Sequence, residues 1–160
     1  MKESTSPYID TLVSLVTVSG IVIVDRITKI IFTKLLALGE SLPVIPNIFH
    51  FTLVNNTGIA FGLFKDHGAV FIIITIVTIG LLIYNIYYYK KNEHLSLTYI
   101  VSFSLILGGA IGNLIDRIFI GHVVDFIDFR IWPVFNVADS AITVGAIFIC
   151  LKCLTTKERK

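Results

Sequence analysis

The sequence predicts an all-α membrane protein, with four transmembrane helices and a small β-containing outer loop region at the membrane interface. Two observations support this: a shortage of charge, and four apolar segments long enough to cross a bilayer. Of the 160 residues, 55% are hydrophobic and only 15% are charged, against roughly a quarter charged in soluble domains. A soluble domain needs a largely polar surface. The formal net charge of +2 also argues against a nucleic-acid partner.

The chain contains four apolar segments. A membrane-spanning helix needs about 20 mostly apolar residues. The middle two segments are the clearest, because residues 68–89 and 97–115 contain no charged side chain. The first segment carries Asp25, Arg26, Lys29 and Lys34, and the fourth carries Asp139 near its start. The predicted spans are residues 10–36, 68–89, 96–119 and 136–154, all in one domain of residues 1–160.

The distribution of Lys and Arg predicts the orientation of these helices, because basic loops are retained on the cytoplasmic side. Basic residues precede the first helix, follow the second and close the chain, as Lys2, Lys90, Lys91, Lys152, Lys157, Arg159 and Lys160. The opposite side has mainly Lys65 and Arg130. Both termini are therefore expected to be cytoplasmic, with outer loops at about 37–67 and 120–135.

The longer outer loop has a β-type run. Residues Ile48–Val54 follow Pro43 and Pro46 and precede Asn55–Gly58, which has a turn-like composition. Such a bounded run of aromatic and β-branched residues favours a strand. We expect this strand to lie along the lipid interface.

Four aspartates converge at the predicted outer ends of the helices: Asp25, Asp116, Asp125 and Asp139. An ionisable group in the hydrocarbon region costs at least a few kcal/mol, so each is a functional candidate. Helical spacing suggests their partners. Asp25 can pair with Lys29, Asn113 can reach Asp116 and Arg117, and Asn136 can cap the last helix or bind a neighbouring carboxylate.

The aspartates differ in what surrounds them. The pairs Asp25–Lys29 and Asp116–Arg117 are equally compatible with merely locking helices together. Asp125 and Asp139 have no basic residue at helical spacing and are therefore the better catalytic candidates. Two carboxylates close together near lipid would share one proton, as in aspartic peptidases.

Two other classes of protein remain open at this point. A small proton-coupled transporter would also use intramembrane carboxylates, although nearer the midplane. A non-catalytic membrane assembly factor is a weaker alternative.

Five sequence blocks, spread from the first helix to the fourth, resemble the lipoprotein signal peptidase (signal peptidase II) family. In order they are Val24–Lys29 (VDRITK), Asn56–Phe61 (NTGIAF), Gly108–Arg117 (GGAIGNLIDR), Gly121–Phe126 (GHVVDF) and Phe135–Ser140 (FNVADS). One departure is Ile59, where an alanine is common in the family. The resemblance implies an aspartyl endopeptidase that cleaves a prolipoprotein immediately before its diacylglyceryl-modified cysteine.

The resemblance also implies roles for individual residues. The catalytic dyad falls on Asp125 and Asp139, with Asp116 as the main rival to Asp125. Support and substrate-binding positions fall on Asp25, Lys29, Asn56, Asn113, Asp116, Arg117 and Asn136. No metal or organic cofactor is implied. The expected setting is the bacterial cytoplasmic (inner) membrane, with a monomer acting near its outer face on lipid-modified prolipoproteins and in contact with membrane lipid.

Two further signals are expected to be structural. The Cys150–Cys153 spacing lies within a predicted membrane helix, where small apolar packing is favoured over a metal or redox role. His122 precedes Asp125 by three residues and is expected to be an interfacial structural histidine. The histidines have no convergent spacing for a metal site.

Overall fold

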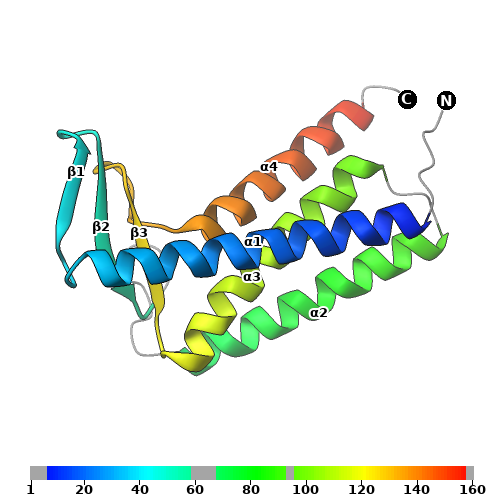
Figure 1. The fold of residues 1–160 in the computed structure, drawn as a ribbon. Coiled ribbons are helices and arrows are strands. Elements are labelled where there is room, and N and C mark those ends of the chain that lie inside the picture. The colour runs from blue at the N-terminus through cyan, green and yellow to red at the C-terminus, as the bar shows by residue number, and fades with distance from the viewer. Residues whose placement is uncertain (1–6, 59–67, 93–95, 158–160) are drawn as a thin grey trace.

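A computed structural model describes residues 7–58, 68–92 and 96–157, which form four helices and one three-stranded sheet (Figure 1). The elements are α1 (Pro7–Leu35), β1 (Ser41–Ile45), β2 (Phe49–Asn56), α2 (Gly68–Asn92), α3 (Leu97–Phe119), β3 (Val123–Asp128) and α4 (Val137–Lys157). The helices match the four predicted segments to within a few residues. The end of the long outer loop, with Ile59 and Lys65, lies outside the described residues, as does Lys2.

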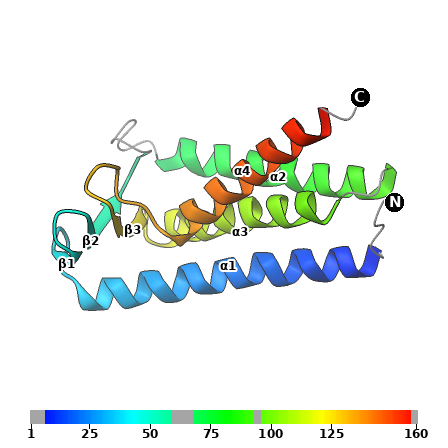
Figure 2. The same cartoon turned by 90° about the horizontal axis from the view of Figure 1, so that it is seen from above.

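Helix α3 packs against each of the other helices, and Figure 2 shows it between α1 on one side and α2 and α4 on the other. Small residues allow this packing. A Cβ atom on Gly109 would lie 2.3 Å from the Ala138 carbonyl oxygen, and one on Gly145 would lie 2.7 Å from that of Ser102. The α3 and α4 backbones therefore touch along their length.

Two helical stretches in the described part of the chain are long and apolar enough to cross a membrane, Leu97–Phe119 and Val137–Thr155. The apolar stretch of α2, Ile72–Tyr87, is shorter, and α1 carries several charged residues. Two of the predicted spans therefore meet the criteria of length and composition. The full set of four stays a prediction.

The antiparallel sheet has the order β1-β2-β3 and lies at one end of the helices (Figure 1). Strand β2 confirms the predicted run but extends through Asn55 and Asn56, which we expected in a turn. These residues stay extended because they pair with Val124 and Val123 of β3. Strand β3 itself was not predicted, because its hydrogen-bonding partner lies about 70 residues earlier in the chain.

An aromatic cluster fixes the sheet to the end of α1. The Phe32 ring lies 4.4 Å from Phe51 and 4.3 Å from Phe126, measured between ring centroids. Leu36, Leu53 and Val124 pack beside these rings and are buried. Because side chains alternate along a strand, the packing of Val124 and Phe126 against α1 turns Asp125 to the other face of β3.

Candidate active site

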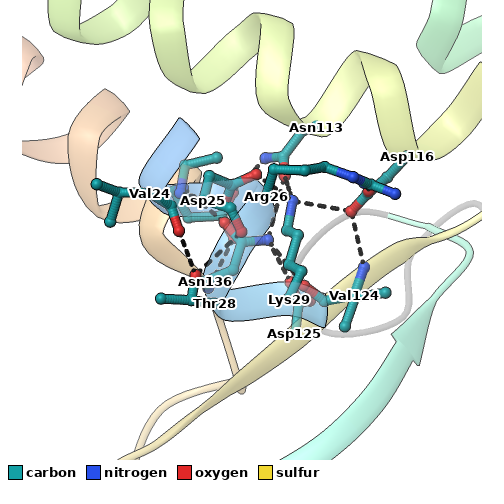
Figure 3. A network of polar contacts seen from close by, with 12 residues as sticks. Val24, Asp25, Arg26, Thr28, Lys29, Asn113, Asp116, Val124, Asp125 and Asn136 are labelled. Carbon is teal, nitrogen blue, oxygen red and sulfur yellow. Dashed lines mark hydrogen bonds and ion pairs between the residues drawn. The ribbon is translucent and has the colours of Figure 1, made fainter. Parts of the chain in front are cut away.

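Lys29 is the centre of a buried polar network at the sheet end of the helices (Figure 3). Its Nζ lies 2.8 Å from Asp25 Oδ2 and 2.8 Å from Asp116 Oδ2, and it donates to Asn113 Oδ1 at 3.0 Å. The predicted Asp25–Lys29 pair is thus confirmed. The ammonium is thus paired with two carboxylates and donates to an amide oxygen, which makes a buried lysine tolerable.

Asp116 is held from three directions. It pairs with Lys29 and Arg26 of α1, and its Oδ2 accepts the backbone N–H of Val124 at 3.2 Å. The expected contact with Asn113 is wrong, because the Asn113 amide turns instead toward Lys29 and α4. Asp116 therefore ties α3 to α1 and to the strand that carries Asp125.

Asp125 lies in the middle of β3 and is 1% exposed. Its two carboxyl oxygens accept hydrogen bonds from side-chain amides: Asn136 Nδ2 at 2.6 Å and Asn56 Nδ2 at 3.0 Å. Burial, and after it the charge of nearby Asp139, raise the pKa of Asp125 to about 7. The group therefore holds a proton over a pH range where an exposed aspartate is ionised.

Asp139 and Asn136 cap the start of α4 reciprocally. The Asp139 backbone N–H donates to Asn136 Oδ1 at 2.9 Å, and the Asn136 backbone N–H donates to Asp139 Oδ2 at 3.3 Å. Asn113 Nδ2 also donates to Asp139 Oδ1 at 2.8 Å. The sequence predicted that Asn136 would cap the helix or bind a neighbouring carboxylate, and it does both.

Asn136 therefore connects the two carboxylates that sequence reasoning favoured for catalysis. The charge of Asp139 acts directly on Asp125, and the positive charges of Lys29 and Arg117 act on Asp139. A pair of interacting, largely buried carboxyl groups titrates as a unit and can share one proton. Such a pair can activate water with one member and hydrogen-bond a carbonyl with the other.

Most of the predicted support residues also gather here. Asp25 contacts Lys29 and accepts the Ala138 backbone N–H at 3.0 Å. Asn56 Oδ1 accepts the Gly58 backbone N–H at 3.0 Å, which orients its amide toward Asp125. Arg117 lies within electrostatic reach of Asp125 and Asp139.

Cys150 and Cys153 are exposed on α4, and the described residues contain no group of three or more His, Cys, Asp or Glu placed to hold a metal ion.

Sequence reasoning missed two parts of the network. In the sequence Arg26 is only one of several charges within the first helix, yet it pairs with buried Asp116. A cation inside an apolar segment was the available signal. The hydrogen bonds donated by the Val124 and Ala138 backbones have no signal in the sequence, because any residue except proline can supply a main-chain N–H.

Comparison with known proteins matches residues 17–155 to the family model described as signal peptidase (SPase) II. Two curated relatives are named lipoprotein signal peptidase. The one from Halothermothrix orenii is 46% identical over 131 residues, covering 82% of this chain and 88% of its own. The one from Caldanaerobacter subterraneus subsp. tengcongensis is 47% identical over 137 residues, covering 85% and 92%. A bacterial membrane enzyme solved by the in meso method at 2.3 Å resolution superposes with a TM-score of 0.84 at 37% identity, covering 92% of this chain and 90% of its own.

Proposed function

The chain belongs to the signal peptidase II family, and from this premise we propose that Asp125 and Asp139 are the catalytic dyad of an aspartic-type peptidase. Its reaction is the removal of signal peptides from prolipoproteins, as in the relatives named lipoprotein signal peptidase. We place the cleaved bond immediately before the lipid-modified cysteine. The single observation that carries the dyad is Asn136, which binds Asp125 with its side chain and Asp139 with its backbone and side chain.

The surroundings of the two aspartates favour different roles. Asp125 is fully buried with its pKa raised to about 7, so it is the member that holds the shared proton. Asp139 is half-buried at the N-terminal end of α4, where the helix dipole stabilises negative charge. Lys29 and Arg117 add positive charge nearby. Because Asp139 is the more exposed of the two carboxyl groups, we assign it as the member that is ionised at the start of the reaction.

These roles give a complete hydrolytic step. Asp139 accepts a proton from a water molecule, whose oxygen attacks the scissile carbonyl carbon while protonated Asp125 hydrogen-bonds the carbonyl oxygen. The C–N bond then breaks, and a proton passes from the dyad to the leaving amine. Asn56 and Asn136 hold Asp125 in place, and Asn113 holds Asp139. Asp25, Lys29, Asp116 and Arg117 position this frame.

The position of the dyad suits a substrate anchored by lipid. The network lies at the sheet end of the bundle, whereas the start of α1 and the end of α4 are both at the opposite end (Figure 1). With four helices spanning the bacterial cytoplasmic membrane and both termini in the cytoplasm, the site would face the outer leaflet. We propose that the enzyme acts there as a monomer. The transporter alternative has no support, because the carboxylates gather at one end of the bundle.

The decisive experiment uses the full chain in a lipid bilayer with a diacylglyceryl-modified prolipoprotein as substrate. Asp125→Asn and Asp139→Asn should each lower the cleavage rate by about 10³-fold or more, because neither variant can hold and transfer the shared proton. Asp128→Asn is the matched control: Asp128 lies on the same strand and is buried, but it is bonded to Thr52 and Arg130. It should cleave at nearly the normal rate.

Normal cleavage by either dyad variant would remove that residue from the catalytic assignment. If Asp116→Asn were inactive while both dyad variants remained active, the dyad would have to be reassigned. Thermal unfolding of each variant separates loss of chemistry from loss of fold.

A further inference from the structure

A second concave site lies outside the dyad. A cavity of about 620 Å³ opens between the C-terminal half of α1, strand β2 and the segment that follows α3. Val124 lines it, whereas neither Asp125 nor Asp139 does. Since neighbouring residues of a strand point to opposite faces, the cavity lies on the face of β3 turned away from the dyad. Its volume falls in the range of small-molecule sites.

The cavity lining combines basic and apolar side chains. Arg26, Lys29 and Lys34 line it together with His122, and among the described residues no acidic side chain does. Arg26, Ile30 and Lys34 are spaced four residues apart, so they form one stripe along α1. Apolar walls come from Ile30, Leu53 and Ile120.

The ion pairs leave part of the positive charge and some N–H donors of this lining available for a ligand. Asp25 and Asp116 balance Lys29 and Arg26, but none of the ion pairs in the described part of the chain involves Lys34. The Arg26 side chain is 36% exposed, and its contact with Asp116 uses Nη1. A guanidinium has further N–H donors in a fixed fork that suits phosphate. The cavity thus retains a net positive charge and free donors.

We propose that this cavity binds the phosphate group of an anionic phospholipid, with Lys34 and Arg26 at the phosphate and the apolar wall along the lipid chains. Two exposed apolar side chains extend this wall: Leu38 (64% exposed) lines the cavity, and Phe119 (76% exposed) precedes the lining residue Ile120. A site that combines cations with apolar surface matches a molecule that has both a phosphate and hydrocarbon. Free phosphate would match the cations of this site but not its apolar surface.

The experiment measures lipid retention by the purified full chain with native mass spectrometry. Phosphatidylglycerol, phosphatidylcholine and inorganic phosphate are the probes. The wild type should retain phosphatidylglycerol over phosphatidylcholine. Lys34→Glu should lower phosphatidylglycerol retention at least about fivefold, as expected for a lost cation at a lipid surface. Lys34→Arg should restore it.

Two controls make the result specific. Lys152→Glu makes the same charge change at the far end of α4 and should retain lipid as the wild type does. Asp125→Asn, which removes the proposed catalytic group, should also bind lipid normally, so the lipid site and the proposed peptidase function can fail separately. Equal retention of the two lipids by the wild type, or unchanged retention by Lys34→Glu, would overturn the proposal. Displacement of phosphatidylglycerol by inorganic phosphate would overturn the lipid assignment in favour of the free ion.

Discussion

The two faces of strand β3 have opposite compositions and opposite tasks. Phe126 stacks on Phe32 of α1 with the rings 4.3 Å apart, in a cluster without polar side chains. Asp125, one residue earlier, is bonded only to amide groups, from β2 and from the residue preceding α4. Adjacent residues of one strand, with side chains on opposite faces, therefore provide an apolar anchor and a proposed catalytic carboxyl group.

The difference shows how a costly site is held. Burying carboxylates and a lysine lowers stability unless each group is well partnered, and even then the net gain is small. Burying aromatic rings stabilises the fold without such conditions. We infer that the apolar face supplies the stability with which the polar face is kept in place, and three experiments test this division.

The largest expected effect is on the apolar face. Phe126→Ala should lower the free energy of unfolding by about 3–5 kcal/mol, because it removes a buried ring and leaves a cavity. Denaturant unfolding in detergent measures this. Phe129→Ala is the matched control, since that ring is 44% exposed and should cost much less. Similar losses for the two variants would contradict the role assigned to the cluster.

On the polar face, removing a side-chain charge should raise the free energy of unfolding above neutral pH instead of lowering it. The pKa of Asp125 is about 7 in the folded chain and near 4 when unfolded, so the folded form binds the proton more tightly. Stability from this group is therefore greatest below about pH 4 and is lost as the pH rises through about 7. Asp125→Asn has no group to ionise and so avoids this loss. At about pH 8 its free energy of unfolding should exceed that of the wild type by a few kcal/mol.

Asp128 provides the comparison on the same strand. Burial acts to raise its pKa, but hydrogen bonds from Thr52 and Arg130 outweigh burial and hold the pKa below the ordinary value. Its contribution is present above the unfolded pKa and is lost as the pH falls through the folded one. Asp128→Asn should therefore destabilise the chain at neutral pH. An identical pH profile for the two variants would refute the distinction.

The smallest effect concerns the contact that seats Asp139. Gly109→Ala would place a Cβ atom 2.3 Å from the Ala138 carbonyl oxygen, one residue before Asp139, and should cost about 1–3 kcal/mol of stability as α4 is displaced. Cleavage should slow as well. Gly20→Ala is the control in α1, where nothing lies within 4 Å; it should be neutral or stabilising by up to about 1 kcal/mol. Equal behaviour of the two alanines would show that the close contact is unimportant.

The sequence predicted the parts of this molecule that depend on local spacing. The four helical segments follow from the length of the apolar runs, and the Asp25–Lys29 pair and the two contacts of Asn136 follow from reach along a helix. Strand β3 and the extension of β2 through Asn56 did not, because their hydrogen bonds join distant segments. Arg26 was missed as the partner of Asp116 for the same reason. The catalytic roles of Asp125 and Asp139 stay predictions until the variants are assayed.

The start of α4 is held by contacts with three other elements. Around its first turn, Asn136 binds β3, Ala138 donates to Asp25 of α1, and Asp139 accepts from Asn113 of α3. The first N–H groups of a helix have no partners within it, so this helix begins on groups supplied by earlier segments. The polar network around Asp125 and Asp139 is therefore complete only when α4 has docked against α1, α3 and β3.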